Sequence, residues 1–241
     1  MRYGIYSDIH GNLEALEAVL EVFLHERVDK YICGGDVVGY GANPKECLEK
    51  VLELDSMLVA GNHDYAIAGK LKIDYFNQHA RQAVMWTREQ LSKKYKNFLA
   101  SVDMVQKLDN KLTLVHSTLS FPELFDYIQT GYDAHLSLEI LDTPICFYGH
   151  SHVPVAFFEG HAVTFSMDDE IDVNPDSKVL VNVGSVGQPR DGNPLASCCV
   201  YDDELGKVWI HRVEYDIDTA VEKIMRAGLP EILAKRLYYG K

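Results

Sequence analysis

The sequence predicts an α/β fold, with a mainly parallel sheet in the first part of the chain and a second, antiparallel sheet after it. Between residues 2 and 64, short apolar runs alternate with amphipathic stretches, which is the pattern of β-α-β units. After residue 152, apolar runs follow one another and are separated by Gly, Asp and Pro. The 241 residues contain no internal repeat or linker, so we expect one domain over residues 1–241.

Three strands and two helices are expected before residue 64. The strands are the apolar runs 4–7, 31–33 and 57–60. Residues 13–25 predict an amphipathic helix that Asn12 caps, because their leucines and phenylalanine recur on one face and their glutamates lie elsewhere. A second helix is expected over residues 44–54, with a proline in its first turn.

The middle of the chain changes character. Residues 65–110 mix Gln, Arg, Lys and Tyr with helix formers, so we expect two helices packed over one edge of the sheet, as a helical cap insertion. Two further parallel-type strands are expected at 112–115 and 145–148, with a short helix at 134–141 between them.

The remaining elements complete the predicted fold. The strands expected in the second sheet are 155–159, 179–183, 196–201 and 207–213. A final amphipathic helix is expected over 216–227, stopped by Gly228, and Pro230 opens a last short helix.

Composition excludes several classes of function. The net charge is −13 and the basic residues are scattered, so no extended nucleic-acid partner is expected. No apolar run approaches the roughly 20 residues that span a bilayer, and no leader pattern opens the chain, so no membrane partner is expected. The five cysteines have no paired spacing and fit a reduced, cytoplasmic location.

Residues that can bind metal ions follow each of the five parallel-type strands. The carboxyl ends of such strands lie close together, so side chains distant in the sequence converge there. Two divalent ions need a bridging carboxylate, for which Asp36 is the natural choice. We assign one ion to Asp36 with Asp8, His10 and His152, and the other to Asp36 with Asn62, His116 and His150.

Each of these residues also has an ordinary structural interpretation. Asp8 and His10 alone are typical of a loop and helix cap, and His116 alone is typical of a hydrogen-bonded core histidine. His150 and His152, two residues apart at the end of a strand, are a stronger indication of metal binding. The joint pattern at five strand ends favours the metal site.

The blocks around these residues resemble the calcineurin-like metallophosphoesterase superfamily. They are Asp8-Ile9-His10-Gly11-Asn12, Gly35-Asp36, Gly61-Asn62-His63-Asp64, His116 and Gly149-His150-Ser151-His152. The resemblance implies two packed sheets flanked by helices, with residues 153–213 completing the second sheet. The segments 35–41, 182–190 and 228–230 resemble the prokaryotic phosphodiesterase-like branch.

This resemblance implies a two-metal phosphoesterase in which a metal-bridging hydroxide attacks phosphorus. It also implies that His63 is a general acid or stabilises the oxyanion, and the alternative is a hydrogen bond to a metal ligand. Arg190 could bind a substrate phosphate or pair with Asp191. Tyr40 could line a substrate pocket with Tyr65 and Phe121, or all three could be packing residues.

One departure from the superfamily bears on the substrate. Its well-known protein phosphatases carry Asp-Arg where this chain has Gly39 and Tyr40, which favours small phosphodiester substrates. The alternatives are a dinucleoside polyphosphate hydrolase, a protein phosphatase, or a non-catalytic metal-binding scaffold. The mixed ligands accept several metals, among which Mn is expected first, Fe next, and Ni, Co or Zn after them. The sequence leaves the natural substrate and the oligomeric state open.

Overall fold

Strand β1 (Arg2–Tyr6) shows how the sequence builds the centre of the molecule. Successive side chains of a strand point to opposite faces, and both faces of β1 are covered. Tyr3 and Ile5 belong to the core between the two sheets, whereas Tyr6 packs with Phe23 of helix α1 (Leu13–His25) on the other side. A continuously apolar strand therefore marks a strand buried on both faces.

The computed structural model describes residues 1–241, and it contains two sheets of six strands each. In the first sheet the strand order is β3-β2-β1-β11-β12-β9. Strands β1, β2 and β3 are parallel, and β11 runs antiparallel to β1. The other strands of this sheet are β2 (Lys30–Cys33), β3 (Met57–Leu58), β9 (Glu170–Asp172), β11 (Ala196–Asp202) and β12 (Lys207–Val213).

In the second sheet the strand order is β4-β5-β6-β10-β7-β8. Strands β5, β6 and β10 are parallel, and the others are antiparallel to their neighbours. The strands are β4 (Val105–Leu108), β5 (Leu112–Val115), β6 (Ile145–Tyr148), β7 (Val155–Phe158), β8 (Thr164–Ser166) and β10 (Val179–Asn182).

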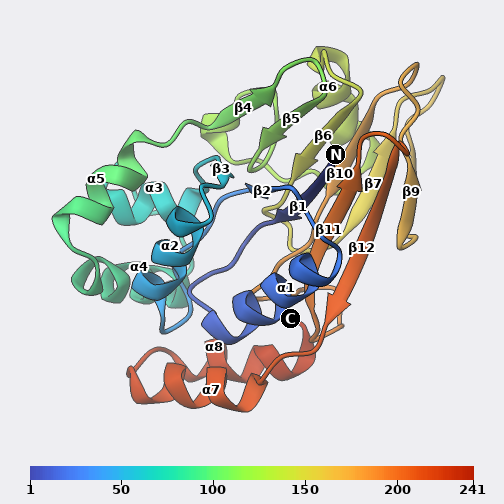
Figure 1. The fold of residues 1–241 in the computed structure, drawn as a ribbon. Coiled ribbons are helices and arrows are strands. Elements are labelled where there is room, and N and C mark those ends of the chain that lie inside the picture. Colours follow the sequence, from blue (N-terminus) through green and yellow to red (C-terminus); the bar gives the residue numbers. More distant parts are fainter.

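The helices cover the outer faces and the ends of the two sheets (Figure 1). Helix α1 packs on the first sheet, and α6 (Gly131–Ile140) covers the outer face of the second. Helices α3, α4 and α5 lie together at the left of Figure 1, and α7 and α8 lie below α1. The remaining helices are α2 (Pro44–Glu53), α3 (Asn62–Ala68), α4 (Gln78–Gln90), α5 (Lys93–Ser101), α7 (Ile217–Arg226) and α8 (Glu231–Lys235), with short 3-10 turns η1 (Pro122–Leu124) and η2 (Arg236–Tyr239).

The predicted two-sheet α/β architecture is confirmed, but the predicted division of strands between the sheets is wrong. The five parallel-type strands do not share a sheet, because β5 and β6 belong to the second one. Conversely, β11 and β12 extend the first sheet instead of joining β7 and β10. The reason is that apolar patterning reports which faces are buried and carries no information on which strands pair.

Residues 65–110 contain the two expected helices, α4 and α5. They also contain most of α3 and the strand β4, which forms the edge of the second sheet and which the sequence did not predict. Strand β4 has only partly buried and exposed residues, so it lacks the apolar run by which the other strands were found.

Candidate metal centre

The loops that leave β1, β2 and β6 have an unusual backbone. Non-glycine residues rarely adopt positive φ, and such conformations persist only where the surroundings enforce them. Here the loops enforce them on one another, since the Asp8 amide donates to the Gly35 carbonyl and the His10 amide to the Asp36 carbonyl, both over 2.9 Å. Positive φ angles of 49° to 67° occur at five predicted ligands, Asp8, His10, Asp36, His150 and His152.

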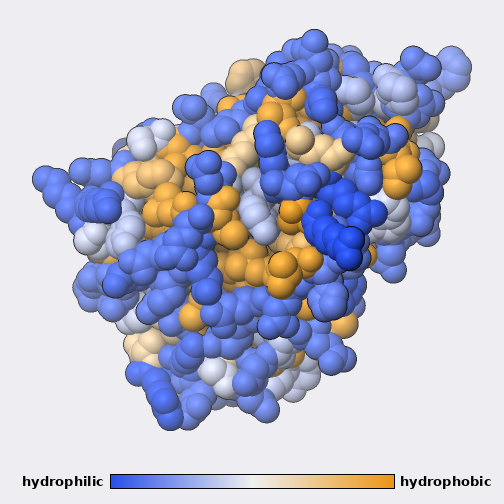
Figure 2. All heavy atoms as spheres, viewed as in Figure 1, coloured by the Kyte–Doolittle hydropathy of each residue, from blue (hydrophilic) through white to orange (hydrophobic).

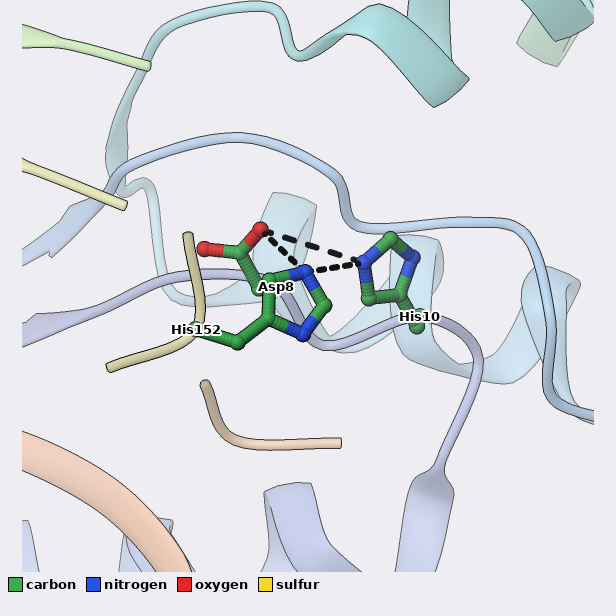
Figure 3. A group of neighbouring side chains, drawn as sticks. All are labelled: Asp8, His10 and His152. Carbon is green, nitrogen blue, oxygen red and sulfur yellow. Dashed lines mark hydrogen bonds and ion pairs between the residues drawn. The ribbon is translucent and has the colours of Figure 1, made fainter. Parts of the chain in front are cut away.

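The first cluster of potential ligands contains Asp8, His10 and His152, all buried. Asp8 Oδ1 lies 3.1 Å from His152 Nε2 and 3.8 Å from His10 Nε2. The two Nε2 atoms lie 3.2 Å apart. Figure 3 shows that Asp8 and His10 come from one loop and that His152 reaches them from another segment of the chain.

The second cluster contains Asp36, His116 and His150, also buried. Asp36 Oδ2 lies 3.5 Å from His116 Nε2, and His116 Nε2 lies 3.2 Å from His150 Nδ1. The same Oδ2 atom lies 3.7 Å from His10 Nε2, so Asp36 faces both clusters. Asp36 also belongs to a third group with His10 and His63.

The hydrogen bonds of the imidazoles leave their other nitrogen atoms free for a cation. Nδ1 of His116 donates to the Gly34 carbonyl over 2.7 Å, and Nδ1 of His152 donates to the Gln188 carbonyl over 2.6 Å. In the neutral form with its proton on Nδ1, each ring directs its Nε2 lone pair into the centre, as in metal-binding histidines. The Nε2 atoms of His10 and His152 lie 3.2 Å apart, so one cation could bind both of them.

Two buried oxygen atoms also indicate a bound cation. Asn62, the first residue of α3, has an Oδ1 atom that is buried and accepts no hydrogen bond, and the same is true of Asp8 Oδ1. A buried acceptor without a donor is costly, and a bound cation satisfies it. The predicted donor set of carboxylate, amide and imidazole groups therefore fits divalent metal ions.

The charges of the buried groups suit such ions. Burial lowers the pKa of His10 well below its usual range and that of His150 to about 3, so both imidazoles are neutral. Burial opposes ionisation of Asp36, but His116 and His63 outweigh it and hold the pKa of Asp36 well below its usual range. Burial also lowers the pKa of His116, but the Asp36 carboxylate outweighs it and raises that pKa to about 9. Metal binding at this cluster must therefore displace a proton.

The missing side chain of Gly61 makes room for the Asp36 carboxylate. A Cβ atom at Gly61 would lie 2.0 Å from Asp36 Oδ1, so only glycine fits there. The Asp36 Oδ1 atom accepts a hydrogen bond of 2.8 Å from the His63 amide in the first turn of α3. The β3–α3 junction thus fixes both the carboxylate and the backbone of His63.

The His63 ring is enclosed by other rings. Its centroid lies 4.4 Å from that of Tyr40, 4.9 Å from that of His10 and 5.1 Å from that of Phe76. His63 Nδ1 is buried and has no hydrogen-bond partner. Burial lowers the pKa of His63 to about 4, although Asp36 opposes this change.

A pocket of about 380 Å³ opens over the two clusters. It brings together Asp36, Asn62, His63, His150 and His152 with Tyr40 and Arg190. Arg190 lies over the Tyr40 ring, with 5.8 Å between its Cζ atom and the ring centroid. The alternative pairing of Arg190 with Asp191 does not occur, because Asp191 pairs with Arg212 over 2.6 Å.

The two other aromatic residues proposed for the pocket do not line it. The Tyr65 hydroxyl donates to the Val102 carbonyl over 2.7 Å as part of the packing of α3, and the Phe121 side chain is 68% exposed outside the pocket. The aromatic lining comes instead from Tyr75 and Phe76 before α4 and from Phe125 and Tyr127 after η1. Nothing in the local sequence marked these four residues, because they lie in irregular segments far from the ligand blocks.

Hydrophilic residues cover most of the face seen in Figure 2, and apolar residues show between them toward its centre. No helix of the chain is both long and apolar enough to cross a membrane. This agrees with the absence of long apolar runs in the sequence.

Comparison with known families identifies the superfamily of the chain. The sequence model of the calcineurin-like phosphoesterase superfamily domain matches residues 1–204 of the chain. The chain belongs to this superfamily. It is accordingly a phosphoric ester hydrolase with a buried cluster of aspartate and histidine residues suited to divalent metal ions.

Individual relatives of the chain extend this finding. The uncharacterized protein MJ0912 of Methanocaldococcus jannaschii is 40% identical over 99% of this chain and 98% of its own length. The phosphodiesterase YfcE of Escherichia coli is 25% identical over 86% of this chain and 91% of its own. A metallophosphoesterase structure from Sphaerobacter thermophilus matches with a TM-score of 0.88 and 41% identity, covering 100% of this chain and 99% of that one.

Proposed function

We propose that this phosphoesterase hydrolyses small phosphodiesters with two divalent metal ions. The observation that carries the proposal is the position of Asp36, whose Oδ2 atom faces His10 of one cluster and His116 of the other. A carboxylate shared by two clusters of nitrogen and oxygen donors is the arrangement that two-metal hydrolysis requires.

The proposed ligands follow from this arrangement. One ion is held by Asp8, His10, His152 and the shared Asp36, and the other by Asn62, His116, His150 and Asp36. When bound, the ions would supply a nucleophile by lowering the pKa of a water, and would neutralise the phosphoryl oxygens. Manganese is the expected metal, with iron next and nickel, cobalt or zinc after them.

The residues of the chain that act on the substrate border the same pocket. His63 lies beside Asp36 without belonging to either proposed ligand set, so it serves as general acid or stabilises the oxyanion. Burial keeps His63 neutral in the resting protein, and charge on a bound phosphate would raise its proton affinity. Arg190 binds a phosphoryl oxygen, and Tyr40 supports the Arg190 and His63 side chains through its ring.

Two features support small diester substrates. Gly39 and Tyr40 stand where the protein phosphatases have Asp-Arg, and a relative over most of this chain is named a phosphodiesterase. Residues of the segment 71–77, which precedes α4, line the pocket together with Phe125 and Tyr127, and would limit the size of a bound substrate.

The experiment that tests the function is hydrolysis of bis(4-nitrophenyl) phosphate by protein loaded separately with Mn, Fe, Co, Ni and Zn. We expect turnover with Mn and lower rates with 4-nitrophenyl phosphate, a monoester. Absence of diester cleavage with all five metals would contradict the proposal.

A variant separates the role of His63 from metal binding. His63→Ala is expected to lower kcat by about 10² to 10⁴, the usual contribution of an acid-base group, because it removes the proton donor. Metal content, measured by mass spectrometry, should equal that of the wild type. A variant that loses metal together with activity would instead make His63 a support for the ligands.

A further inference from the structure

Two arginine side chains share one acceptor beside the metal centre. Arg190 Nη2 and Arg236 Nη1 donate to the same atom, Gln188 Oε1, over 2.9 and 3.1 Å. Arg190 precedes β11 in the sequence, and Arg236 opens η2 near the end of the chain. The tertiary structure therefore places two guanidinium groups next to each other on a single neutral oxygen.

Neither guanidinium group forms an ion pair, although the chain has 36 Asp and Glu residues. The nearest candidate in sequence, Asp191, pairs with Arg212. The Nε atoms of Arg190 and Arg236 are both buried and have no hydrogen-bond partner. Two half-buried like charges without a counter-ion repel each other, and an anion between them removes this cost.

The pair is connected to the centre through Gln188. The backbone carbonyl of Gln188 accepts from His152 Nδ1 over 2.6 Å, while its side chain carries the two arginines. The Arg190 amide also donates to the His152 carbonyl over 3.2 Å, and its side chain borders the pocket. An anion on this pair would lie on the His152 side of the centre, beside a phosphate held there.

The chemistry of the pair indicates its ligand. Guanidinium groups bind phosphate oxygens through paired N–H donors, and the amide oxygen of Gln188 already occupies the position of one such acceptor. Arg236 lies outside residues 1–204, the part of the chain that matches the superfamily, so it is contributed by this chain's C-terminal segment.

We propose that Arg190 and Arg236 form an anion subsite that binds a second phosphate group of the substrate. The proposal rests on the proposed function and narrows its substrate class to esters that carry a second phosphate close to the scissile one. A free phosphate ion would satisfy the same donors, so the test must distinguish a linked phosphate from a free one.

The test is calorimetric binding of methylenediphosphonate, which carries two linked phosphonates, and of methylphosphonate, which carries one, to the Mn-loaded protein. We expect methylenediphosphonate to bind at least about tenfold more tightly, the effect of one charge-assisted hydrogen bond. Methylphosphonate with added inorganic phosphate should not reproduce this preference. If it does, the subsite takes a free anion and the proposal is wrong.

Variants assign the preference to the arginine pair. Arg236→Gln is expected to abolish the tenfold preference and leave methylphosphonate affinity unchanged. Arg226→Gln is the matched control, because Arg226 is 75% exposed, pairs with Glu222 and lies away from the site, and it should keep the preference. An unchanged preference in Arg236→Gln overturns the proposal.

A second variant tests the subsite in a protein that is expected to remain folded. Gln188→Glu places a permanent carboxylate between the two guanidinium groups, so it should block the subsite while the unfolding temperature stays at or above that of the wild type. Retention of the preference in this variant overturns the proposal. Because binding is measured, the subsite can hold even if no ester is cleaved, and the two proposals fail separately.

Discussion

The His63 ring is held by shape, since its Nδ1 atom has no hydrogen-bond partner and three rings surround it. On its fourth side the His63 ring lies against Gly39, which has a φ of +100°. A Cβ atom at Gly39 would lie 2.7 Å from His63 Nδ1, a distance that real contacts do not allow. The glycine in place of the phosphatase aspartate thus supplies space for the ring instead of a carboxylate to orient it.

Gly39→Ala tests this arrangement. The new methyl group should displace the His63 ring, and a misplacement of about 1 Å can lower kcat about 100-fold. Metal content should stay unchanged, because Gly39 belongs to neither ligand cluster.

Gly69→Ala is the matched control for this prediction. Gly69 has a φ of +82° and nothing within 4 Å of the added Cβ, so it shares the backbone strain without the contact. Its kcat should equal that of the wild type. Equal kcat values in both variants would show that Gly39 does not position His63.

At the scale of elements, the start of α1 ties two loops of the site together. Asn12 Oδ1 accepts from the Ala15 amide over 3.2 Å, which caps α1 as the sequence predicted. Its Nδ2 atom donates to the Gly187 carbonyl over 3.0 Å. One side chain therefore fixes both the helix after Asp8 and His10 and the loop that carries Gln188.

Asn12→Ala should lose both interactions. Asn77 offers the comparison, because it caps α4 by accepting from Ala80 over 2.9 Å and makes no second bond of this kind. We expect Asn77→Ala to lower the free energy of unfolding by about 1 kcal/mol, and Asn12→Ala by about 1 kcal/mol more. Urea unfolding measures both, and equal losses would mean that the bond to Gly187 contributes nothing.

At the scale of the molecule, the proposed metal centre spans both sheets. Asp8 and Asp36 follow β1 and β2 of the first sheet, whereas His116 and His150 follow β5 and β6 of the second. Ions held by both sets of residues would connect the two sheets at one end. They would also neutralise the buried carboxylates of Asp8 and Asp36.

Removing the metal should therefore destabilise the whole fold. A ligand at 100 times its Kd stabilises the folded state by about 2.7 kcal/mol, so a chelator should lower the Tm of the Mn-loaded protein by several degrees. Asp36→Asn, which alters both clusters, should make the Tm nearly independent of Mn. A wild-type Tm that does not respond to the chelator would contradict a structural contribution of the ions.

At the opposite side of the fold, Asp203 forms a second link between the sheets. It lies after β11 of the first sheet and binds Lys111, which lies before β5 of the second, over 2.6 Å. It also binds the Met1 amino group over 2.7 Å, and its side chain is only 10% exposed. Burial alone would raise the pKa of Asp203, but Lys111 and the Met1 amino group outweigh it and lower that pKa.

The lowered pKa predicts a dependence of stability on pH. The stabilisation is complete above the ordinary Asp value of about 3.9 and is lost as pH falls through that value toward the lower folded pKa. Asp203→Asn should lower the Tm at pH 6, and its difference from the wild type should shrink below about pH 4. Asp142→Asn is the control, because its pair with Lys107 is exposed and contributes little. A constant difference from pH 6 to pH 3 would contradict the prediction.

Local sequence predicted much of the fold and of the candidate site. Apolar periodicity located α1 and α2 to within a residue, and Asn12 was identified as a cap, because these features depend on neighbours within about four positions. The seven potential ligands could be proposed for a similar reason, since each lies within a few residues of the end of a short apolar run. Of the proposed substrate residues, Arg190 and Tyr40 do border the pocket.

Tertiary structure alone decided what depends on contacts between distant segments. Whether β11 pairs with β1 or with β10 is a matter of strand pairing, which an apolar run does not encode. The pocket walls at Tyr75 and Tyr127, and the meeting of Arg236 with Arg190 on Gln188, arise where irregular segments and the chain end fold back onto the sheets. The sequence by itself thus determined which chemical groups gather at the strand ends, because secondary structure is local. The packing of the two sheets decided what surrounds those groups, because it joins residues that no local pattern relates.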